Sequence, residues 1–504
     1  MGSHLRARLR CRIADVNRLP AHTPVLVGIG TATQREENFA RALEPLDLML
    51  EAVTAAGMDS GSSVTLAGAQ YLAVPHGRWS YRNPAGALAR ALGAERATTV
   101  LASVGVLQQS LIGEACARIA RGDAHTTLVV GADAGYRLLR AQIAGRQAGE
   151  CVQDDAPDIH LAPEDELFHP VETRAGLQLA VGLYAIMESA FRAQQGWSVA
   201  EHRDRLAELG ARFSQVAAAN PHAWQRRAVD ARAIREASDR NPMQAFPYTR
   251  FHCSTWNVDQ AAALLFCSAA RAEQLGIPRS RWIFPVASTE SNHMVPVSAR
   301  EDLAASPGAR IAGRAALAAG DLQIQDIDLV ELYSCFPVAV ETFATALGIP
   351  LTRELTITGG MPFAGGPFNN YVFQATCRAA ELLRQGGART ALVSSVSGLL
   401  TKQGFGLWSV SPAPQGFVQA DLSEAVAREV RTREVLNAFT GEATVAGYTV
   451  LHGRRQSPRG IALVDTLQGQ RAMTTTENPA LIARLQEEEF VGRRVQINDN
   501  ELMS

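Results

Sequence analysis

Apolar and polar positions follow the same order of elements twice along this chain. In residues 24–135, and again in residues 248–410, segments with apolar residues at helical spacing alternate with short, continuous apolar runs. Such runs are typical of strands buried on both faces, and their alternation with helices indicates a parallel sheet covered by helices. We therefore predict an α/β fold built from a duplicated unit, with a cleft where the two copies meet.

The two copies can be matched element by element. The central helix is expected to end near Arg121 in the first copy and near Gln385 in the second, and a glycine turn and an apolar run follow each helix. Upstream, the runs at 64–67 and 327–330 occupy equivalent places, so we expect both to be strands. The similarity of single residues is weak, but the shared order of elements favours duplication.

A glycine-rich run at 356–371 precedes the central helix of the second copy. It holds four glycines, two prolines and the pair Asn369 and Asn370, between a β-rich segment at 354–358 and a helix expected over 372–383. Glycine lets a backbone approach a ligand closely, and a helix N-terminus attracts negative charge, so the run predicts a binding loop. A solvated connection has the same composition. The two asparagines are also good N-caps, worth about 1 kcal/mol without any ligand.

Two further regions depart from the duplicated pattern. Residues 136–247 are charged and poor in strands, with apolar positions at helical spacing, which indicates a helical insertion. Alternating positions at 441–451, 459–467 and 491–497 predict antiparallel strands. We expect these strands to form a small all-β barrel of roughly 80 residues, of the OB type. The resulting domains are 1–135, 136–247, 248–415 and 416–504.

Composition is that of an ordinary globular protein. Of 504 residues, 47% are hydrophobic and 19% charged, and a formal net charge of -2 gives no general attraction to nucleic acid or to an anionic membrane. No stretch approaches the ~20 apolar residues of a membrane span. The seven cysteines lack CxxC spacing, so we expect no metal site, no disulfide framework and a cytoplasmic location. Tyr448 is the only aromatic residue in the three barrel strands, which argues against oligonucleotide binding.

The chain resembles the thiolase superfamily in four strings, at 253–263, 328–337, 356–371 and 400–402. Within the superfamily it looks like the thiolase-like proteins of type 1, often labelled acetyl-CoA acetyltransferase, which carry an extra C-terminal β domain. The similarity extends from about Val25 to the C-terminus. It implies a duplicated thiolase fold of five layers (αβαβα), with the helical insertion and an OB-like C-terminal barrel.

The resemblance also implies where catalytic groups would lie. A thiolase needs a cysteine nucleophile, a histidine that activates it, an asparagine-held water and a second cysteine. At the matching positions the nucleophile loop 102–109 has no cysteine, and Gly-Gly-Pro at 365–367 replaces Gly-His-Pro. Residues 333–336 replace Asn-Glu-Ala-Phe, and residues 395–397 replace Cys-x-Gly. Chemistry through a cysteinyl intermediate on that loop is therefore not expected, and Ser103 is no substitute because the motif holds no histidine near it.

A relocated nucleophile is one alternative. Cys335 lies at the motif that normally holds the enolate water. The resemblance places His252 beside the pantetheine arm and His293 on a loop that lines the acyl pocket. A Cys335 thiolate with His293 or His252 as base would replace the missing pair. The structural alternative is that the apolar-flanked cysteine is buried and inert, and that each histidine is a hydrogen-bonded loop residue.

The resemblance supplies further candidates for binding a thioester. They are Ser254, Tyr333, Gly365, Gly366, Asn369, Asn370, Gln374 and Ser395. In the related type 1 proteins we expect histidines where Gln374 and Gln403 stand. Lys402 follows an apolar strand and either meets a CoA phosphate or faces water, surface lysine being the commoner case. No bound cofactor is expected, and a coenzyme A thioester would be the substrate or ligand.

Two hypotheses about function follow. The first is a thiolase-like acyltransferase that acts on or binds an acyl-CoA or an acyl-carrier-protein thioester. The second is a non-catalytic thiolase-fold scaffold that docks a partner protein through its C-terminal β domain. The resemblance leaves open a homodimer through the edge of the core sheet and a companion protein, whereas neither nucleic acid nor membrane is expected as a partner.

Overall fold

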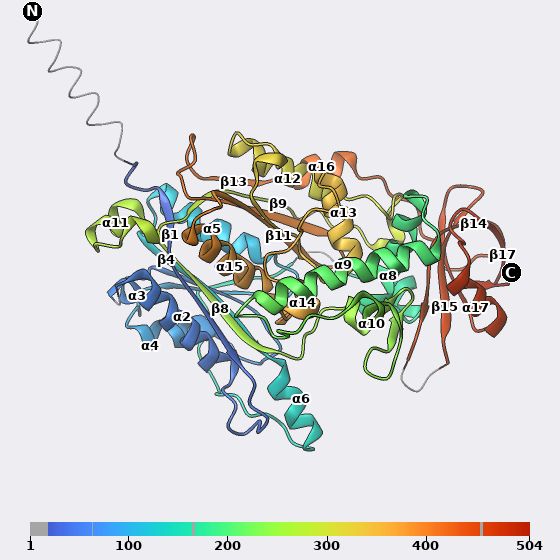
Figure 1. The fold of residues 1–504 in the computed structure, drawn as a ribbon, viewed down its shortest axis with the longest axis horizontal. Helices are drawn as coiled ribbons and strands as arrows, with labels where there is room; N and C mark the ends of the chain where they lie inside the picture. Colours follow the sequence, from blue (N-terminus) through green and yellow to red (C-terminus); the bar gives the residue numbers. More distant parts are fainter. Residues whose placement is uncertain (1–18, 63, 164–166, 454–456, 504) are drawn as a thin grey trace, which may run out of the picture.

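The computed structural model describes residues 19–62, 64–163, 167–453 and 457–503 (Figure 1). The first sheet runs in the order β1 (Pro24–Gln34), β8 (Asp259–Ser268), β4 (Thr126–Ala134), β2 (Tyr71–Pro75), β3 (Thr98–Ala102) and β5 (Ile159–Leu161). The second sheet runs in the order β10 (Leu329–Glu331), β11 (Thr390–Ser397), β12 (Lys402–Ser409), β9 (Phe284–Ser291) and β13 (Val418–Asp421). Both sheets therefore contain strands that are distant in the sequence.

Two helices, α5 (Gln108–Arg121) and α15 (Tyr371–Gln385), form the layer between the sheets. Helix α5 contacts β4 and β9, and α15 contacts β8 and β11, so each touches both sheets. The outer helices are α2 (Pro45–Ser60) and α4 (Pro84–Leu92) on the first sheet, and α12 (Pro307–Ala319) with α13 (Pro337–Leu347) beside it on the second. The predicted five-layer αβαβα order is confirmed.

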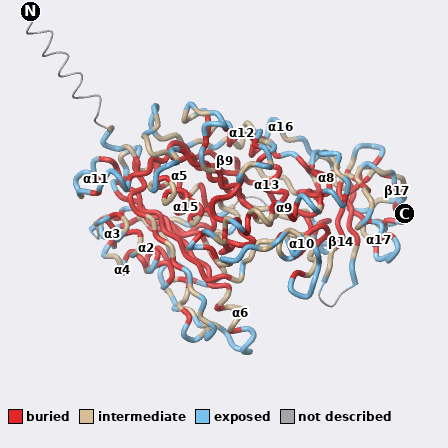
Figure 2. Tube along the Cα trace, viewed as in Figure 1, coloured by how far each residue is buried: buried red, intermediate tan, exposed pale blue. Residues whose placement is uncertain are grey.

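Close packing of helix on strand explains two glycines in β1. A Cβ at Gly28 would lie 2.1 Å from the carbonyl oxygen of Ala56, and one at Gly30 would lie 2.0 Å from that of Ala52, both in α2. Only glycine allows the helix backbone to come this close to the sheet. Buried positions follow the strands of both sheets and the helices between them (Figure 2).

The predicted helix ends near Arg121 and Gln385 are confirmed. Two short predicted strands are wrong. Residues 64–67 form helix α3 (Val64–Ala67), in which Val64 is 62% exposed, and the buried strand is β2 instead. Residues 354–358 are irregular, because backbone N–H groups in this segment bind a buried carboxylate rather than a neighbouring strand.

The insertion supplies helices and a strand. Its helices are α6 (Gly135–Ile143), α7 (Pro170–Arg174), α8 (Ala180–Gln194), α9 (Val199–Ala219) and α10 (Ala231–Arg235). Its strand β5 pairs in parallel with β3, from Ile159 opposite Val100 to Leu161 opposite Ala102. Strand β5 therefore covers the edge that β3 would otherwise present.

The C-terminal region forms a closed five-stranded barrel, so the predicted small β domain is confirmed. Its strands are β14 (Gly441–Leu451), β15 (Arg459–Thr466), β16 (Arg471–Thr476), β17 (Arg494–Asn498) and β18 (Glu501–Leu502). Strand β15 pairs with both β16 and β14, which closes the ring. Helix α17 (Pro479–Glu487) packs on it, and β6 (Met243–Ala245) and β7 (Tyr248–Thr249) extend the sheet.

Three further helices are short. Helix α11 (Ala269–Gln274) follows β8, α14 (Gly360–Phe363) lies within the glycine-rich run, and α16 (Ser423–Glu429) packs against α12. Among the described residues, no helix is both long enough and apolar enough to cross a membrane.

A buried ion pair joins the barrel to the insertion. Arg192, near the end of α8, is 1% exposed. Its guanidinium donates to the carboxylate of Glu489 at 2.8 and 3.0 Å and to the hydroxyl of Tyr448 at 2.8 Å. Because Tyr448 lies in β14 and Glu489 follows α17, one side chain holds two parts of the barrel against α8.

We predict that Arg192→Ala destabilises the protein by about 2 kcal/mol, because it removes a fully buried guanidinium and leaves Tyr448 and the 31% exposed Glu489 without their partner. A shift of the urea unfolding midpoint measures the effect. Arg205→Ala is the matched control: Arg205 also pairs with a glutamate, Glu201, at 2.9 Å, but both side chains are about half exposed. The control should cost less than about 1 kcal/mol, because it removes only an exposed ion pair and a cation–π contact with Trp197. Equal losses in the two variants would contradict the anchoring role of Arg192.

Candidate functional site

The two central helices begin at the same place. Gln108, the first residue of α5, accepts a hydrogen bond at Oε1 from the backbone N–H of Val372 (2.7 Å) and donates from Nε2 to Oδ1 of Asn369 (3.2 Å). Tyr371, the first residue of α15, packs edge-on against Tyr333 with ring centroids 5.7 Å apart. We call this meeting point of α5, α15 and the Tyr333 corner the central junction.

Several buried polar atoms at the central junction have no hydrogen-bond partner among the described residues. They are Nδ2 of Asn369, both amide atoms of Asn370, Oε1 of Gln109 and Oγ of Ser395. Asn370, Gln109 and Ser395 are each at most 1% exposed. An unpaired buried polar group costs about 1–3 kcal/mol, so such atoms are normally completed by ordered water or by a ligand.

The capping of α15 differs from the sequence prediction. Asn370 occupies the N-cap position, but its side chain caps nothing. The carboxamide of Gln108, from the other central helix, accepts the N–H of Val372 instead. The expectation that the two asparagines act as ordinary N-caps is therefore wrong. Helix α5 also begins without a side-chain cap, at Leu107, so both N-termini direct partial positive charge into the junction.

Side-chain alternation along β12 decides which neighbours belong to the junction. A Cβ at Gly404 would lie 3.0 Å from Cβ of Gln109 and 3.5 Å from Cβ of Ser395, so this position faces α5. Gln403 points to the opposite face, where its Oε1 would lie 1.9 Å from a Cβ at Gly308 of α12. Ser395 therefore belongs to the junction, whereas Gln403 lies on the outer face of the second sheet.

A buried carboxylate fixes the glycine-rich run beside the junction. Glu331 accepts hydrogen bonds from the backbone N–H groups of Ile357 (2.7 Å) and Thr358 (3.0 Å). It also accepts from the hydroxyls of Tyr371 (2.5 Å) and Thr356 (3.0 Å). Burial raises the pKa of this carboxyl, and the hydrogen bonds oppose that rise. The run is thus held by a fully bonded side chain, which explains why it is not a strand.

Packing explains why residues 365 and 366 of the glycine-rich run are glycines. Gly365 has a φ of 106°, and a Cβ there would lie 2.2 Å from Oε1 of Gln260. A Cβ at Gly366 would lie 2.0 Å from Oγ of Ser254, so the structure brings Ser254 and this loop together. A side chain at 366 would require Ser254 to move, and one at 365 would also be strained by the positive φ. Gln374, one turn into α15, lines a small cavity of about 20 Å³.

The structure does not bring Cys335 to a histidine. Burial raises the pKa of the Cys335 thiol to about 12, and that of Cys253 to about 12 as well. His252 uses Nδ1 for the backbone N–H (3.1 Å) and hydroxyl (2.9 Å) of Thr249, and burial lowers its pKa to about 4. No hydrogen bond within the described ranges joins Cys335 to His252 or His293. A buried thiol without an imidazole partner is a poor nucleophile at neutral pH.

His293 lies apart from the junction. It lines a cavity of about 320 Å³ with Arg300 and Gln403, at the start of α12. Lys402 is 5% exposed, so the expectation of a surface lysine is wrong. Its charge counteracts the rise in pKa that burial imposes on Glu290, a carboxylate that accepts a 2.6 Å hydrogen bond from the hydroxyl of a serine in α5.

Ser103 has a histidine neighbour that the sequence did not reveal. Its Oγ lies 2.9 Å from Nε2 of His160, which β5 of the insertion brings alongside. The register places His160 opposite Leu101. Leu101 packs with residues of the outer helices α2 and α4, whereas Ala102 packs with residues of the central helix α5. Because Ser103 and Leu101 share a face, the pair is directed to the outer side of the sheet, away from the central junction.

An aromatic and cationic patch lies where the junction reaches solvent. The guanidinium of Arg78 lies 5.6 Å from the ring of Trp256 and 5.9 Å from the ring of Phe368, whose neighbour Asn369 is half-buried. Trp256 is 50% exposed. Arg78 is held by an ion pair with the buried carboxylate of Asp133. We call these side chains the Trp256–Arg78 patch.

Comparison with known proteins shows that the chain has the fold of a thiolase-like protein. No family model matches the chain. A monomeric SCP2-thiolase-like protein type 1 from Mycobacterium smegmatis is 27% identical with a TM-score of 0.81, and the match covers 96% of this chain and 100% of that one. The resemblance to the thiolase superfamily, and the duplicated thiolase fold with its added β domain, are therefore confirmed.

Matches at lower identity or shorter length agree. The Ltp2-ChsH2(DUF35) aldolase is 17% identical with a TM-score of 0.60, over 78% of this chain and 99% of that one. An acetyl-CoA acetyltransferase from Syntrophomonas wolfei is 20% identical with a TM-score of 0.53, over 78% of this chain and 100% of that one. An acetyl-CoA acetyltransferase from Methanocaldococcus jannaschii is 28% identical over 94 residues, which is 19% of this chain and 24% of that protein. The two structures show the fold alone.

The thiol environments predict unequal alkylation. At pH 8 a thiol with a pKa of about 12 is about one ten-thousandth thiolate, and Cys335 is only partly accessible. Partial burial and the nearby Glu44 raise the pKa of Cys151 less, to about 11, and this thiol is exposed, so iodoacetamide should modify it at least tenfold faster than Cys335. Peptide mass mapping over a time course measures both rates. Fast alkylation of Cys335 that disappears in His252→Ala would reveal an activated thiolate and contradict this description.

Proposed function

We propose that this thiolase-fold chain binds an acyl-CoA or acyl-carrier thioester at the central junction and acts there as a thiolase-like acyltransferase. One observation carries the proposal. Two helix N-termini without side-chain caps of their own meet at a group of buried amide and hydroxyl groups that lack hydrogen-bond partners in the described ranges of the chain. A polar ligand is the natural complement of such a group.

A thioester carbonyl has the required chemistry. Each helix N-terminus carries roughly half an elementary positive charge, which favours an oxygen that gains negative charge during attack or enolisation. The amides of Asn369 and Asn370 and the hydroxyl of Ser395 supply further donors. The junction thus offers polarisation of a carbonyl rather than a nucleophile.

The proposed transfer does not pass through a cysteinyl intermediate. The thiols of Cys335 and Cys253 remain protonated at neutral pH, since burial raises both pKa values to about 12. The acceptor therefore attacks the bound thioester directly: a bond forms to the carbonyl carbon, the C–S bond breaks, and the departing thiolate of CoA or of the carrier takes up the proton that the acceptor loses. Proximity at a polarised carbonyl is the main contribution of the protein.

The Trp256–Arg78 patch suits the nucleotide end of coenzyme A. An exposed indole gives a flat surface for stacking an adenine base, and a guanidinium can bind phosphate oxygens. The patch adjoins Phe368 and Asn369, so a ligand lying on it reaches the junction through its pantetheine arm. A carrier-protein thioester would reach the same junction without using the indole.

A companion protein is favoured over a homodimer formed through the edge of the first sheet. Strand β5 already pairs along β3, so on that side a second copy could extend the sheet only from β5, which has 3 residues. One structure with the same fold contains a DUF35 companion. By analogy we place a companion against the C-terminal β domain of this chain. The scaffold hypothesis needs the same partner, and ligand binding distinguishes the two.

Calorimetric titration with acetyl-CoA and acetyl-pantetheine tests the junction. We expect acetyl-CoA to bind the wild type with a Kd below about 1 mM, and Asn370→Leu and Ser395→Ala each to weaken binding at least tenfold, or about 1.4 kcal/mol. Gln194→Leu, which removes an exposed amide at the end of α8, should leave binding unchanged. If neither ligand binds at millimolar concentration, the acyltransferase proposal is wrong and the scaffold hypothesis remains. A separate result, an acyl adduct on Cys335 found by mass spectrometry, would contradict direct transfer.

The patch makes a separate prediction. Trp256→Ala should weaken acetyl-CoA binding about tenfold, because stacking of one base on an aromatic side chain is worth about 1–3 kcal/mol. Acetyl-pantetheine, which has no nucleotide, should bind the variant as it binds the wild type. The same titrations measure both affinities, and an equal loss for the two ligands would show that Trp256 does not contact the nucleotide.

A further inference from the structure

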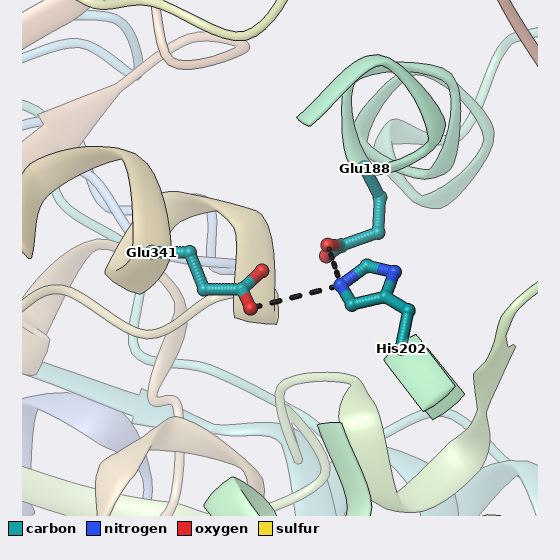
Figure 3. A group of neighbouring side chains, drawn as sticks. All are labelled: Glu188, His202 and Glu341. Carbon is teal, nitrogen blue, oxygen red and sulfur yellow. Dashed lines mark ion pairs between the residues drawn. The ribbon is translucent and has the colours of Figure 1, made fainter. Parts of the chain in front are cut away.

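A group of buried acidic and imidazole side chains lies outside the central junction. Glu188 of α8, His202 of α9 and Glu341 of α13 converge where the insertion packs against the second thiolase unit (Figure 3). One donor atom from each lies within 4.8 Å of the other two. The three side chains are 0%, 1% and 3% exposed. The expectation of no metal site rested on cysteine spacing, and this cluster contains no cysteine.

The contacts in this cluster are short but lack hydrogen-bond geometry. Nε2 of His202 lies 3.0 Å from Oε1 of Glu188 and 3.7 Å from Oε1 of Glu341. Within the described residues, neither ring nitrogen of His202 makes a hydrogen bond, and Oε1 of Glu188 and Oε2 of Glu341 have no partner. The nearest carboxylate oxygen therefore lies close to Nε2 but off the line along which an N–H would point.

Donor atoms that share a metal ion adopt this arrangement. When two ligands bind one ion at about 2.1 Å and at angles of about 90–110°, they lie roughly 3.0–3.5 Å apart, and each sits roughly 40° off the lone-pair axis of the other. The separations of 3.0 and 3.7 Å are close to that range. A hydrogen-bonded imidazolium would instead place an oxygen in line with its N–H.

Neighbouring groups orient the cluster. The hydroxyl of Tyr248 donates to Oε2 of Glu188 at 2.5 Å, which leaves Oε1 facing His202. Outer hydrogen bonds of this kind orient metal-binding carboxylates. The ring of His252 lies 6.1 Å from that of Tyr248, and its buried Nε2 has no hydrogen-bond partner in the part of the chain that the structure describes. His252 also lines a cavity of about 20 Å³ between α9 and α13. That volume is enough for one water.

We propose that Glu188, His202 and Glu341 bind one divalent transition-metal ion of the Zn²⁺ or Mn²⁺ class. One imidazole nitrogen with two carboxylates suits these ions better than Ca²⁺ or Mg²⁺, which prefer oxygen donors alone. Two buried carboxylates also need two positive charges, and a divalent ion supplies both. The ion would join two helices of the insertion to α13 of the thiolase core.

The competing explanation for the short contacts is that bound protons, rather than a metal ion, neutralise the charge of the two carboxylates. Burial by itself would lower the pKa of His202, but the two carboxylates outweigh it and raise the pKa to about 9. Burial and the charge of Glu188 raise the pKa of Glu341 to about 8. A cluster neutralised in this way holds no metal and gains no stability from added zinc.

Metal content and melting temperature of the full-length protein decide between the two. A chelator first removes bound metal, and the protein is then incubated with Zn²⁺ or Mn²⁺ and dialysed. Inductively coupled plasma mass spectrometry measures its metal content, and differential scanning calorimetry measures its Tm. We expect about one ion per chain for one of the two metals and a rise in Tm of about 3 °C. Glu341→Gln and His202→Gln should each retain less than about one tenth of an ion while keeping the circular dichroism of the wild type.

The matched control is His452→Gln, since His452 is a half-buried histidine of the barrel that contacts Gln486 at 3.1 Å. It should keep the ion. Less than about one tenth of an ion in the wild type, or full binding in both cluster variants, would overturn the proposal in favour of bound protons. If the cluster variants do not fold, the visible spectrum of the wild type with Co²⁺ decides: bands of nitrogen and oxygen coordination support the site, and a spectrum of free Co²⁺ excludes it.

Discussion

The hydrogen bond from the start of α15 to Gln108 sets the geometry on which the rest of the core depends. The two central helices come from different copies of the α/β unit and share one layer between the sheets. Because a carboxamide of one helix caps the other, the two N-termini cannot separate without leaving a buried N–H unpaired, at a cost of about 1–3 kcal/mol. Duplication provides the layers, and this cross-capping fixes where both positive helix ends point.

Buried polar side chains near the central junction are of two kinds: some have all their hydrogen bonds made within the protein and stabilise the fold, and others lack partners and are candidates for binding a ligand. Glu331 is fully bonded to the glycine-rich run, so it contributes rigidity and leaves nothing for a ligand. Asn370 and Ser395 are equally buried, but the side-chain amide of Asn370 and the hydroxyl of Ser395 have no hydrogen-bond partner among the residues that the structure describes. Only side chains of the second kind need a bound water or ligand to complete their hydrogen bonds. The half-buried thiol of Cys335 needs no bound group, because a neutral thiol behaves as a small apolar group.

The order of elements could be predicted from the sequence because it depends on periodicity within short segments. The central helices, the layers and the barrel strands all follow from such patterns. Features that depend on contacts between distant segments could not be predicted. The cap that Gln108 gives to α15, the pairing of Ser103 with His160, and the burial of Lys402 each join segments far apart in the chain. The apolar run at 64–67 was wrongly predicted to be a strand for the same reason, because neighbours outside the run decide whether its side chains are buried.

Helix α8 carries two polar anchors one turn apart on the same face, and this arrangement has a mechanical consequence. Glu188 faces α9 and α13, while Arg192, one turn later, faces the barrel. Apolar packing is non-directional and would allow a helix to rotate or slide, whereas a bidentate guanidinium pair or a coordinated ion fixes direction. Helix α13 also follows directly from the Tyr333 corner of the central junction. The buried charges of the insertion therefore fix the barrel and one wall of the junction through the same helix.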